Sequence, residues 1–94
     1  MPTEKNILVL NCGSSSLKFA VINSTTAETV ISGLAERLGS NKATIAIKYN
    51  GEKQVVQLTD NNQHLGAIEY LVSDLHTKGL SDSITAVGHR VVHG

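Results

Sequence analysis

The sequence offers little from which a cross-linked, secreted or membrane-spanning protein could be built. Cys12 is the single cysteine among 94 residues, so no internal disulfide can form. The opening residues 1–5 lack the apolar core of a secretion signal. The longest apolar runs are only a few residues long, whereas a helix needs ~20 to cross a bilayer. We therefore expect a cytoplasmic protein that has no membrane partner.

The sequence also lacks an excess of charge of either sign. Eight basic residues balance eight acidic ones, and the chain contains no run of like charge. This balance argues against a nucleic-acid or anionic-membrane partner, since such partners favour a basic patch or stripe. No internal repeat of roughly 20–50 residues and no low-complexity linker divides the chain. We therefore expect one structural unit, residues 1–94.

A polar loop between two apolar runs is the most informative segment that is present. The runs ILVL and FAVI are typical of strands, and residues 11–18, NCGSSSLK, join them. Gly13 lets the backbone approach an anion closely, three serines offer hydroxyl donors, and Lys18 adds a cation. An ordinary hairpin turn has a similar composition. Because Asn11 and Lys18 are polar where the neighbouring strand residues are apolar, we favour a phosphate site.

The remaining pattern predicts an α/β fold with a mixed sheet. Strands are expected at residues 7–11, 18–23, 28–36, 43–49, 52–58 and 84–92, with a turn at residues 37–42. The first strand is apolar on both faces, which is typical of a central strand covered on both sides. Gly33 weakens the third strand. The dipeptide Asn50-Gly51 tolerates the positive φ angles of a type I′ turn, so the fourth and fifth strands should form a hairpin at the outside of the sheet, with one face wetter.

One helix is expected between this hairpin and the last strand. Asp60 followed by Gln63 resembles a capping box, and Gly79 supplies the stop. Apolar side chains recur at helical spacing between them, namely Leu65, Ile68, Leu71, Val72 and Leu75. The stripe predicts a helix that covers one face of the sheet. We interpret His64 and His76 on this helix as plain surface residues.

A second unusual cluster, GHRVVHG at residues 88–94, ends the last strand. Arg90 in an apolar strand needs a partner or a cavity, and its planar donors match a carboxylate or a phosphate; a surface ion pair is the alternative. His89 and His93 would lie about 13 Å apart on a strand, which argues against a shared metal ion. Cys12 has no histidine or acid close in sequence to activate it, so we interpret it as a structural thiol.

The two clusters together carry a resemblance to a known family. NCGSSSLK after an apolar strand and GHRVVHG later in the chain are similar to the two N-terminal signatures of the acetate kinases, which belong to the actin-like ATPase superfamily. The resemblance implies a ribonuclease H-like (actin-like ATPase) domain, of which residues 1–94 would be the N-terminal part. It also implies reversible transfer of the γ-phosphoryl group of ATP to acetate, giving acetyl phosphate and ADP with Mg²⁺, for which Mn²⁺ can substitute.

The same resemblance implies roles for individual residues. Asn11 would help to hold the magnesium ion, which keeps several waters and so needs few protein ligands. Arg90 would bind the acyl substrate, and His89 and His93 would orient Arg90 or the loop. Lys18 would contact ATP together with loop residues that line the phosphate side of the cleft, namely Gly13, Ser14 and Ser16.

Length is the departure from the family pattern. Acetate kinases are several-fold longer homodimers, with two actin-like domains around the cleft. The family's catalytic acid, its phosphoryl-stabilising histidine and arginine, and its adenosine pocket lie beyond residue 94, so this chain alone should be inactive. Two alternatives stay open. One is a propionate or butyrate kinase, and the other is a non-catalytic module that uses the loop to bind an anion, or an unpaired strand edge to self-associate.

Overall fold

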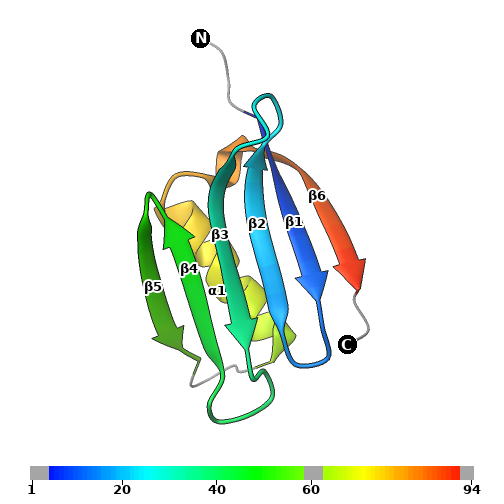
Figure 1. Cartoon of the computed structure of the whole chain (residues 1–94), viewed down its shortest axis with the longest axis vertical. Helices are drawn as coiled ribbons and strands as arrows, with labels where there is room; N and C mark the ends of the chain where they lie inside the picture. Colours follow the sequence, from blue (N-terminus) through cyan, green and yellow to red (C-terminus); the bar gives the residue numbers. More distant parts are fainter. Residues whose placement is uncertain (1–4, 59–62, 92–94) are drawn as a thin grey trace.

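The computed structural model describes residues 5–58 and 63–91, in which six strands form one mixed sheet and one α-helix lies against one of its faces (Figure 1). The strands are β1 (Asn6–Cys12), β2 (Leu17–Asn23), β3 (Thr29–Glu36), β4 (Thr44–Tyr49), β5 (Glu52–Gln57) and β6 (Ile84–Val91). Helix α1 spans His64–Thr77, and a short 3₁₀ helix, η1 (Ser81–Ser83), leads into β6. The predicted α/β class, with a hairpin and a covering helix, is confirmed.

The strand order places β1 inside the sheet. The order is β5-β4-β3-β2-β1-β6, and every neighbouring pair is antiparallel except β1 and β6, which run parallel. Successive strands from β1 to β5 are neighbours, as is usual for antiparallel strands joined by short turns. Helix α1 lies on the path from β5, at one side of the sheet, to β6 at the other (Figure 1). β1 therefore has a hydrogen-bonded partner on each side.

The described part of the sheet is covered on one face only. Along β1, Leu8 and Leu10 are buried on the face that carries α1, whereas Ile7 and Val9 on the opposite face are half-buried. The expectation of a strand covered on both sides is therefore wrong for residues 5–58 and 63–91. The doubly apolar pattern of β1 correctly marked a strand inside the sheet, although β1 lies next to β6, the outermost strand on that side of the described sheet. The pattern alone does not say what covers each face.

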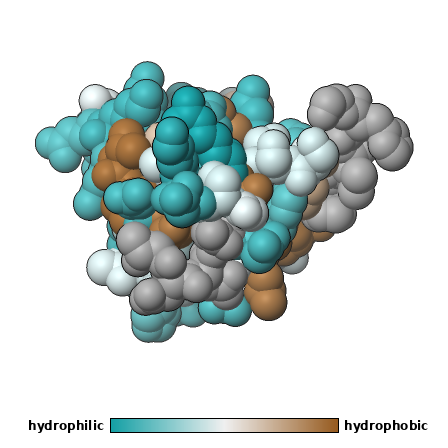
Figure 2. All heavy atoms as spheres, turned by 90° about the horizontal axis from the view of Figure 1, so that it is seen from below, coloured by the Kyte–Doolittle hydropathy of each residue, from teal (hydrophilic) through white to brown (hydrophobic). Residues whose placement is uncertain are grey.

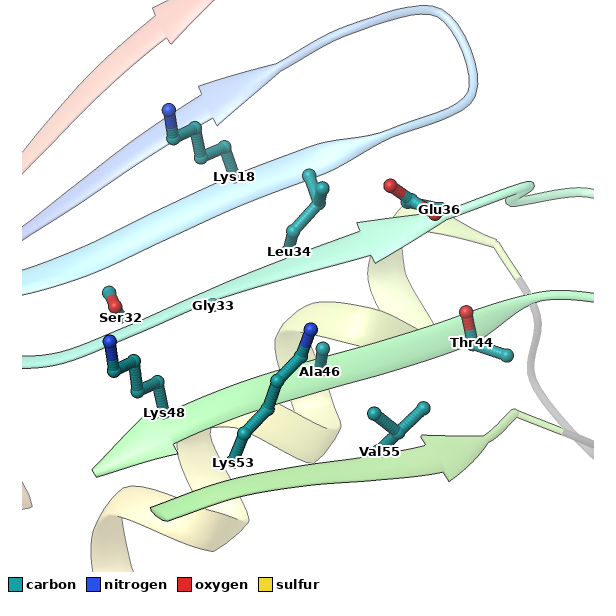
Figure 3. A pocket seen from close by; sticks show the side chains of 10 residues that line it. All are labelled: Lys18, Ser32, Gly33, Leu34, Glu36, Thr44, Ala46, Lys48, Lys53 and Val55. Carbon is teal, nitrogen blue, oxygen red and sulfur yellow. The ribbon is translucent and has the colours of Figure 1, made fainter. Parts of the chain in front are cut away.

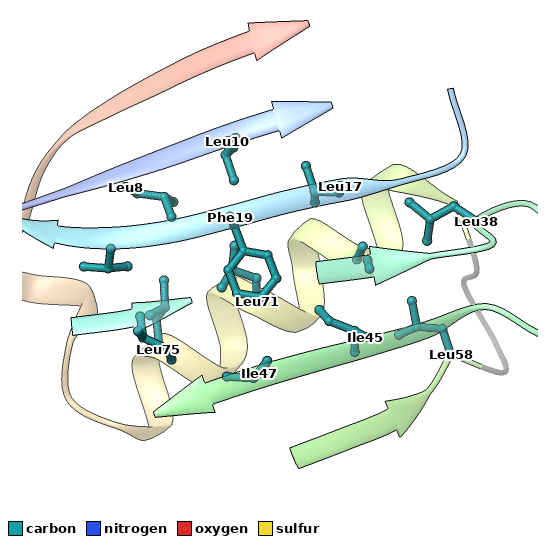
Figure 4. Packing of buried hydrophobic residues seen from close by; sticks show 14 of the residues in the cluster. Leu8, Leu10, Leu17, Phe19, Leu38, Ile45, Ile47, Leu58, Leu71 and Leu75 are labelled. Carbon is teal, nitrogen blue, oxygen red and sulfur yellow. The ribbon is translucent and has the colours of Figure 1, made fainter. Parts of the chain in front are cut away.

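The hydrophobic core lies between α1 and the covered face of the sheet, and Phe19 is its largest fully buried side chain (Figure 4). Phe19 is directly opposite Gly33 on the neighbouring strand β3. A Cβ atom at Gly33 would collide with the Phe19 ring and with the backbone oxygen of Ala46 on β4. The glycine that weakens the strand pattern in the sequence thus provides the space for the core's only phenylalanine ring.

The predicted stripe of helix α1 is confirmed at Leu71 and Leu75, which are buried, and at Ile68, which is partly buried against the core. Ala67, Leu71 and Leu75, spaced four residues apart, are buried. Leu65 and Val72 are 62% and 50% exposed, so the prediction that they pack against the sheet is wrong. The apolar period alone does not distinguish the centre of such a stripe from its rim, where Leu65 and Val72 lie. Within the described residues, no helix has the length and apolar character needed to cross a bilayer.

The sequence signal for the start of α1 is out of register, whereas the signal for its end is confirmed. Gln63 occupies the N-cap position itself, and within the described part of the chain no side chain caps this end. The predicted capping box, which placed Gln63 three residues inside the helix, is therefore out of register, and its Asp60 lies outside the described residues. At the other end, Gly79 has φ +72°, and the N–H groups of Gly79 and Leu80 donate to earlier carbonyls as in a Schellman motif. The predicted stop at Gly79 is confirmed.

The predicted turns and the hairpin are also confirmed. Asn50 and Gly51 have φ angles of 53° and 79°, as a type I′ turn requires, and β5 is the outermost strand on its side of the described sheet. Ile45 and Ile47 on one face of β4 are buried, whereas Lys48 on the other face is exposed. One face of the hairpin is therefore wetter, as predicted.

We expect Gly33→Ala to lower the free energy of unfolding of the chain by about 1–3 kcal/mol, because the added methyl group overpacks the core against a backbone atom that cannot easily move. Gly88→Ala in β6 is the matched control, since no heavy atom of the described residues lies within 4 Å of a Cβ placed there. Urea denaturation of the two variants beside the unaltered chain measures the difference. Equal stability of the two variants would contradict the packing role of Gly33.

Candidate phosphate-binding site

Several segments that are distant in sequence meet at one end of the sheet. The turn between β1 and β2, the turn between β3 and β4, the start of α1 and the end of β6 all lie at the lower edge in Figure 1. Figure 2 looks onto this end, where hydrophilic residues make up most of the coloured surface. The predicted phosphate loop therefore lies at a polar end of the molecule, next to the last described residues of β6.

The loop itself is a tight turn over residues 13–16. The Gly13 N–H donates to the Ser16 carbonyl oxygen at 2.9 Å and closes the turn. A Cβ at Gly13 would lie 2.6 Å from the Ser16 hydroxyl oxygen, so the missing side chain makes room for that hydroxyl. Ser14 and Ser15 at the tip are exposed, and Gly13 and Ser16 at the base are half-buried. The predicted strand, polar turn and returning strand are confirmed.

The carbonyl oxygens of this loop accept hydrogen bonds from other parts of the fold. The ring Nε2 of His64, the first residue of α1, lies 2.8 Å from the Gly13 oxygen and 3.1 Å from the Ser16 oxygen. The Leu38 N–H in the β3–β4 turn donates to the Ser15 oxygen at 2.9 Å. The interpretation of His64 as a plain surface residue is therefore wrong. Its half-buried ring links the helix to the loop, whereas His76 near the other end of α1 is exposed as predicted.

The register of β1 aligns three of the predicted site residues in one row across the sheet. Asn11 on β1 is opposite Lys18 on β2 and opposite Arg90 on β6. Asn11 and Lys18 alternate with the buried Leu10 and Leu17, so they lie on the face that α1 leaves open. For Arg90 the register describes the backbone only. The structure thus brings together the backbone positions of Asn11, Lys18 and Arg90, immediately beside the loop.

Lys18 also lines a broad, shallow depression of about 510 Å³ on the open face of the sheet (Figure 3). Its other cations are Lys48 and Lys53, which are directly opposite one another on β4 and β5. Glu36 is the acidic residue of the lining. The depression extends from Lys18 over β3 and β4 toward β5, away from the loop. It therefore belongs to the predicted site only through Lys18.

The described residues offer little for a metal cage made of protein ligands alone. No group of three or more His, Cys, Asp or Glu side chains within residues 5–58 and 63–91 could hold an ion. Asn11 contributes one amide oxygen, which suits an ion that takes most of its ligands from water and phosphate. Cys12 is half-buried and packs against the core, in keeping with a structural thiol. His93 and the side chain of His89 lie outside the described residues.

Comparison with known proteins connects this arrangement to one family. Residues 6–94 match the sequence model of the Acetokinase family. The chain is 51% identical over 91 residues to the acetate kinase of Chromobacterium violaceum and 50% identical over 92 residues to acetate kinase 1 of Neisseria meningitidis serogroup A. These matches cover 97% and 98% of the chain, but the chain spans only 23% of the length of either relative.

Solved structures also match the fold of the chain. A propionate kinase from Francisella tularensis has a TM-score of 0.87 and 40% identity over 96% of the chain, which corresponds to 23% of that structure. The Porphyromonas gingivalis acetate kinase has a TM-score of 0.81 and 34% identity, again over 96% of the chain and 24% of the structure. The expected fold, the N-terminal part of an actin-like ATPase domain, is confirmed. Because the family match extends over residues 6–94, the chain belongs to the acetokinase family.

Proposed function

We propose that residues 1–94 are the N-terminal part of the first domain of an acetate kinase and form one wall of its site. The whole enzyme would transfer the γ-phosphoryl group of ATP reversibly to acetate, giving acetyl phosphate and ADP. The observation that carries this proposal is the row of Lys18, Asn11 and Arg90 beside the Gly13–Ser16 loop. Membership of the acetokinase family supports it, since the relatives of about 50% identity are acetate kinases.

The chemistry of phosphoryl transfer suits such a wall. This reaction depends mainly on positioning and on neutralising the charge of the transferred group. Lys18 would bind a phosphate oxygen of ATP, and Gly13, Ser14 and Ser16 would line the phosphate side of the cleft. Asn11 would hold Mg²⁺ or Mn²⁺ through its amide oxygen, and the bound ion would neutralise charge on the phosphate oxygens. Asn11 next to Lys18 on the open face supports this division of roles.

Arg90 would recognise the acyl substrate. A guanidinium group presents paired donors that match the two oxygens of a carboxylate, and it matches the phosphate of acetyl phosphate equally well. The backbone of Arg90 is in register with Asn11, next to the position proposed for the metal ion. This register supports a geometry in which the carboxylate of acetate approaches the γ-phosphate from the β6 side of β1.

Propionate is the second candidate for the acyl substrate. The observation that favours it is the close structural match to a protein described as a propionate kinase. We prefer acetate, because the sequence relatives with the higher identities are described as acetate kinases. We further propose that the whole enzyme is cytoplasmic and homodimeric and that it acts without a nucleic-acid or membrane partner, in keeping with its balanced charge.

The first test uses a chimera in which this chain replaces the matching 91-residue segment of the Chromobacterium violaceum acetate kinase. We expect ATP- and Mg²⁺-dependent acyl phosphate formation from acetate at a rate close to that of the unaltered host enzyme. The 94-residue chain alone should be silent, since it spans 23% of that enzyme's length. A chimera that melts like its host but makes no acyl phosphate would overturn the proposal. A shift of preference from acetate toward propionate, relative to the host, would favour the second candidate.

In the same chimera, Lys18→Met should raise the KM for ATP roughly 10- to 150-fold, the value of a hydrogen bond to a charged group, about 1.5–3 kcal/mol. The KM for acetate should change little. Lys48→Met is the matched control, because Lys48 is an exposed lysine that lines the same depression but is remote in register from Asn11. Steady-state kinetics with each substrate varied separately measure both constants. Equal effects of the two substitutions would rule out a specific contact of Lys18 with ATP.

Arg90→Gln should affect the KM of the other substrate, acetate. We expect the KM for acetate to rise at least about tenfold, because a charged bidentate contact is lost, while the KM for ATP changes little. The control is Arg37→Gln, which removes an exposed arginine from the turn between β3 and β4. If Arg90→Gln raised the KM for ATP and left that for acetate unchanged, Arg90 would belong to the nucleotide site instead.

A further inference from the structure

We propose that His64 is the positioning residue of the phosphate loop, which it holds in the shape that receives the phosphates of ATP. The inference rests on the proposed function and extends it to a residue at the start of α1. His64 is 51 and 48 residues distant in sequence from the two residues whose carbonyl groups it contacts. Its ring nitrogen bridges Gly13 and Ser16, the two ends of the turn.

The direction of these hydrogen bonds follows from the atoms involved. Carbonyl oxygens can only accept, so Nε2 of His64 must carry a proton and donate it to both oxygens. The neutral Nε2–H tautomer and the imidazolium ion both meet this requirement. The neutral tautomer that carries its proton on Nδ1 does not, because it would place a lone pair against two carbonyl oxygens. The contact therefore assigns a definite protonation site to the ring.

The contact has a direct consequence for an anion. A carbonyl oxygen carries partial negative charge and repels a phosphate, whereas N–H and hydroxyl groups attract it. His64 binds the carbonyl oxygens of Gly13 and Ser16, and the Leu38 N–H binds that of Ser15. Three carbonyl oxygens of the turn, those of Gly13, Ser15 and Ser16, are thus directed toward the protein. His64 supplies two of these three restraints from a single atom.

The restraint should contribute to affinity through preorganisation. A loop that must be ordered when its ligand binds loses part of the binding free energy to the entropy cost of ordering. The His64 ring joins both ends of the turn to α1, and α1 is itself packed on the core through Ala67, Leu71 and Leu75. The loop is thereby held before ATP arrives. Loss of the His64 donor should weaken ATP binding and leave the binding of acetate, which we assign to Arg90, nearly unchanged.

The test compares three variants in the chimera with the Chromobacterium violaceum enzyme. His64→Leu removes the hydrogen-bond donor. We expect the KM for ATP to rise roughly 3- to 10-fold, as the loss of one or two neutral hydrogen bonds would cause. The KM for acetate should stay unchanged. His64→Gln keeps an N–H group at similar reach and should restore most of the loss. His76→Leu is the matched control, because His76 is an exposed histidine of the same helix, and it should change neither constant.

A second readout does not depend on kinase activity. In a ¹⁵N-histidine-labelled chimera without nucleotide, the resonance that disappears in His64→Gln should show a proton bonded to Nε2. A ring protonated on Nδ1 alone would overturn the proposal, as would a His64→Leu variant that folds and keeps the unaltered KM for ATP. If His64→Leu does not fold, the position of the proton on the His64 ring and the KM for ATP of His64→Gln still test the proposal. If the chimera makes no acyl phosphate, the proposed function fails while the tautomer still tests the contact.

Discussion

The two hydrogen-bond ladders of β1 are the constraint on which the rest of the site depends. One ladder joins β1 to β2, its neighbour in sequence, and the other joins it to β6, which arrives from the far end of the chain. Together they set Asn11 between Lys18 and Arg90. A slip of one residue in either ladder would move the slipped strand's side chains to the opposite face of the sheet. The proposed nucleotide, metal and acyl positions therefore all depend on the register of a single strand.

The packing of the core supports both β1 and the Gly13–Ser16 loop that follows it. Phe19 on β2 fills the space that Gly33 leaves open, and Ala67, Leu71 and Leu75 pack α1 against the same core. This packing holds the first residue of the helix, His64, in contact with the turn that follows β1. The core that stabilises the fold thus also supports the loop proposed to bind phosphate. A substitution in the core between the sheet and α1 can therefore shift His64 and change its hydrogen bonds to the loop.

Local signals in the sequence predicted the parts of the fold that depend on local chemistry. Asn50-Gly51 predicts its turn through positive φ angles, and Gly79 its helix stop, because few other residues adopt those conformations. The contact of His64 with the loop carried no such signal, since a histidine in a first helical turn looks the same whether it meets solvent or a carbonyl group. The exposure of Leu65 was missed for a related reason: the apolar period does not say which side of an apolar stripe faces the sheet. The roles of Asn11 and Arg90 stay predictions.

We propose that the end of the sheet formed by the Gly13–Ser16 loop and the start of α1 receives the phosphates of the nucleotide. Hydrogen–deuterium exchange of the chimera, with and without Mg²⁺ and ATP, distinguishes this position from any other on the sheet. We expect slower exchange in residues 11–18 and at the start of α1, with no change in the β4–β5 hairpin at the opposite side of the sheet. Protection of the hairpin without protection of the loop would contradict the proposal.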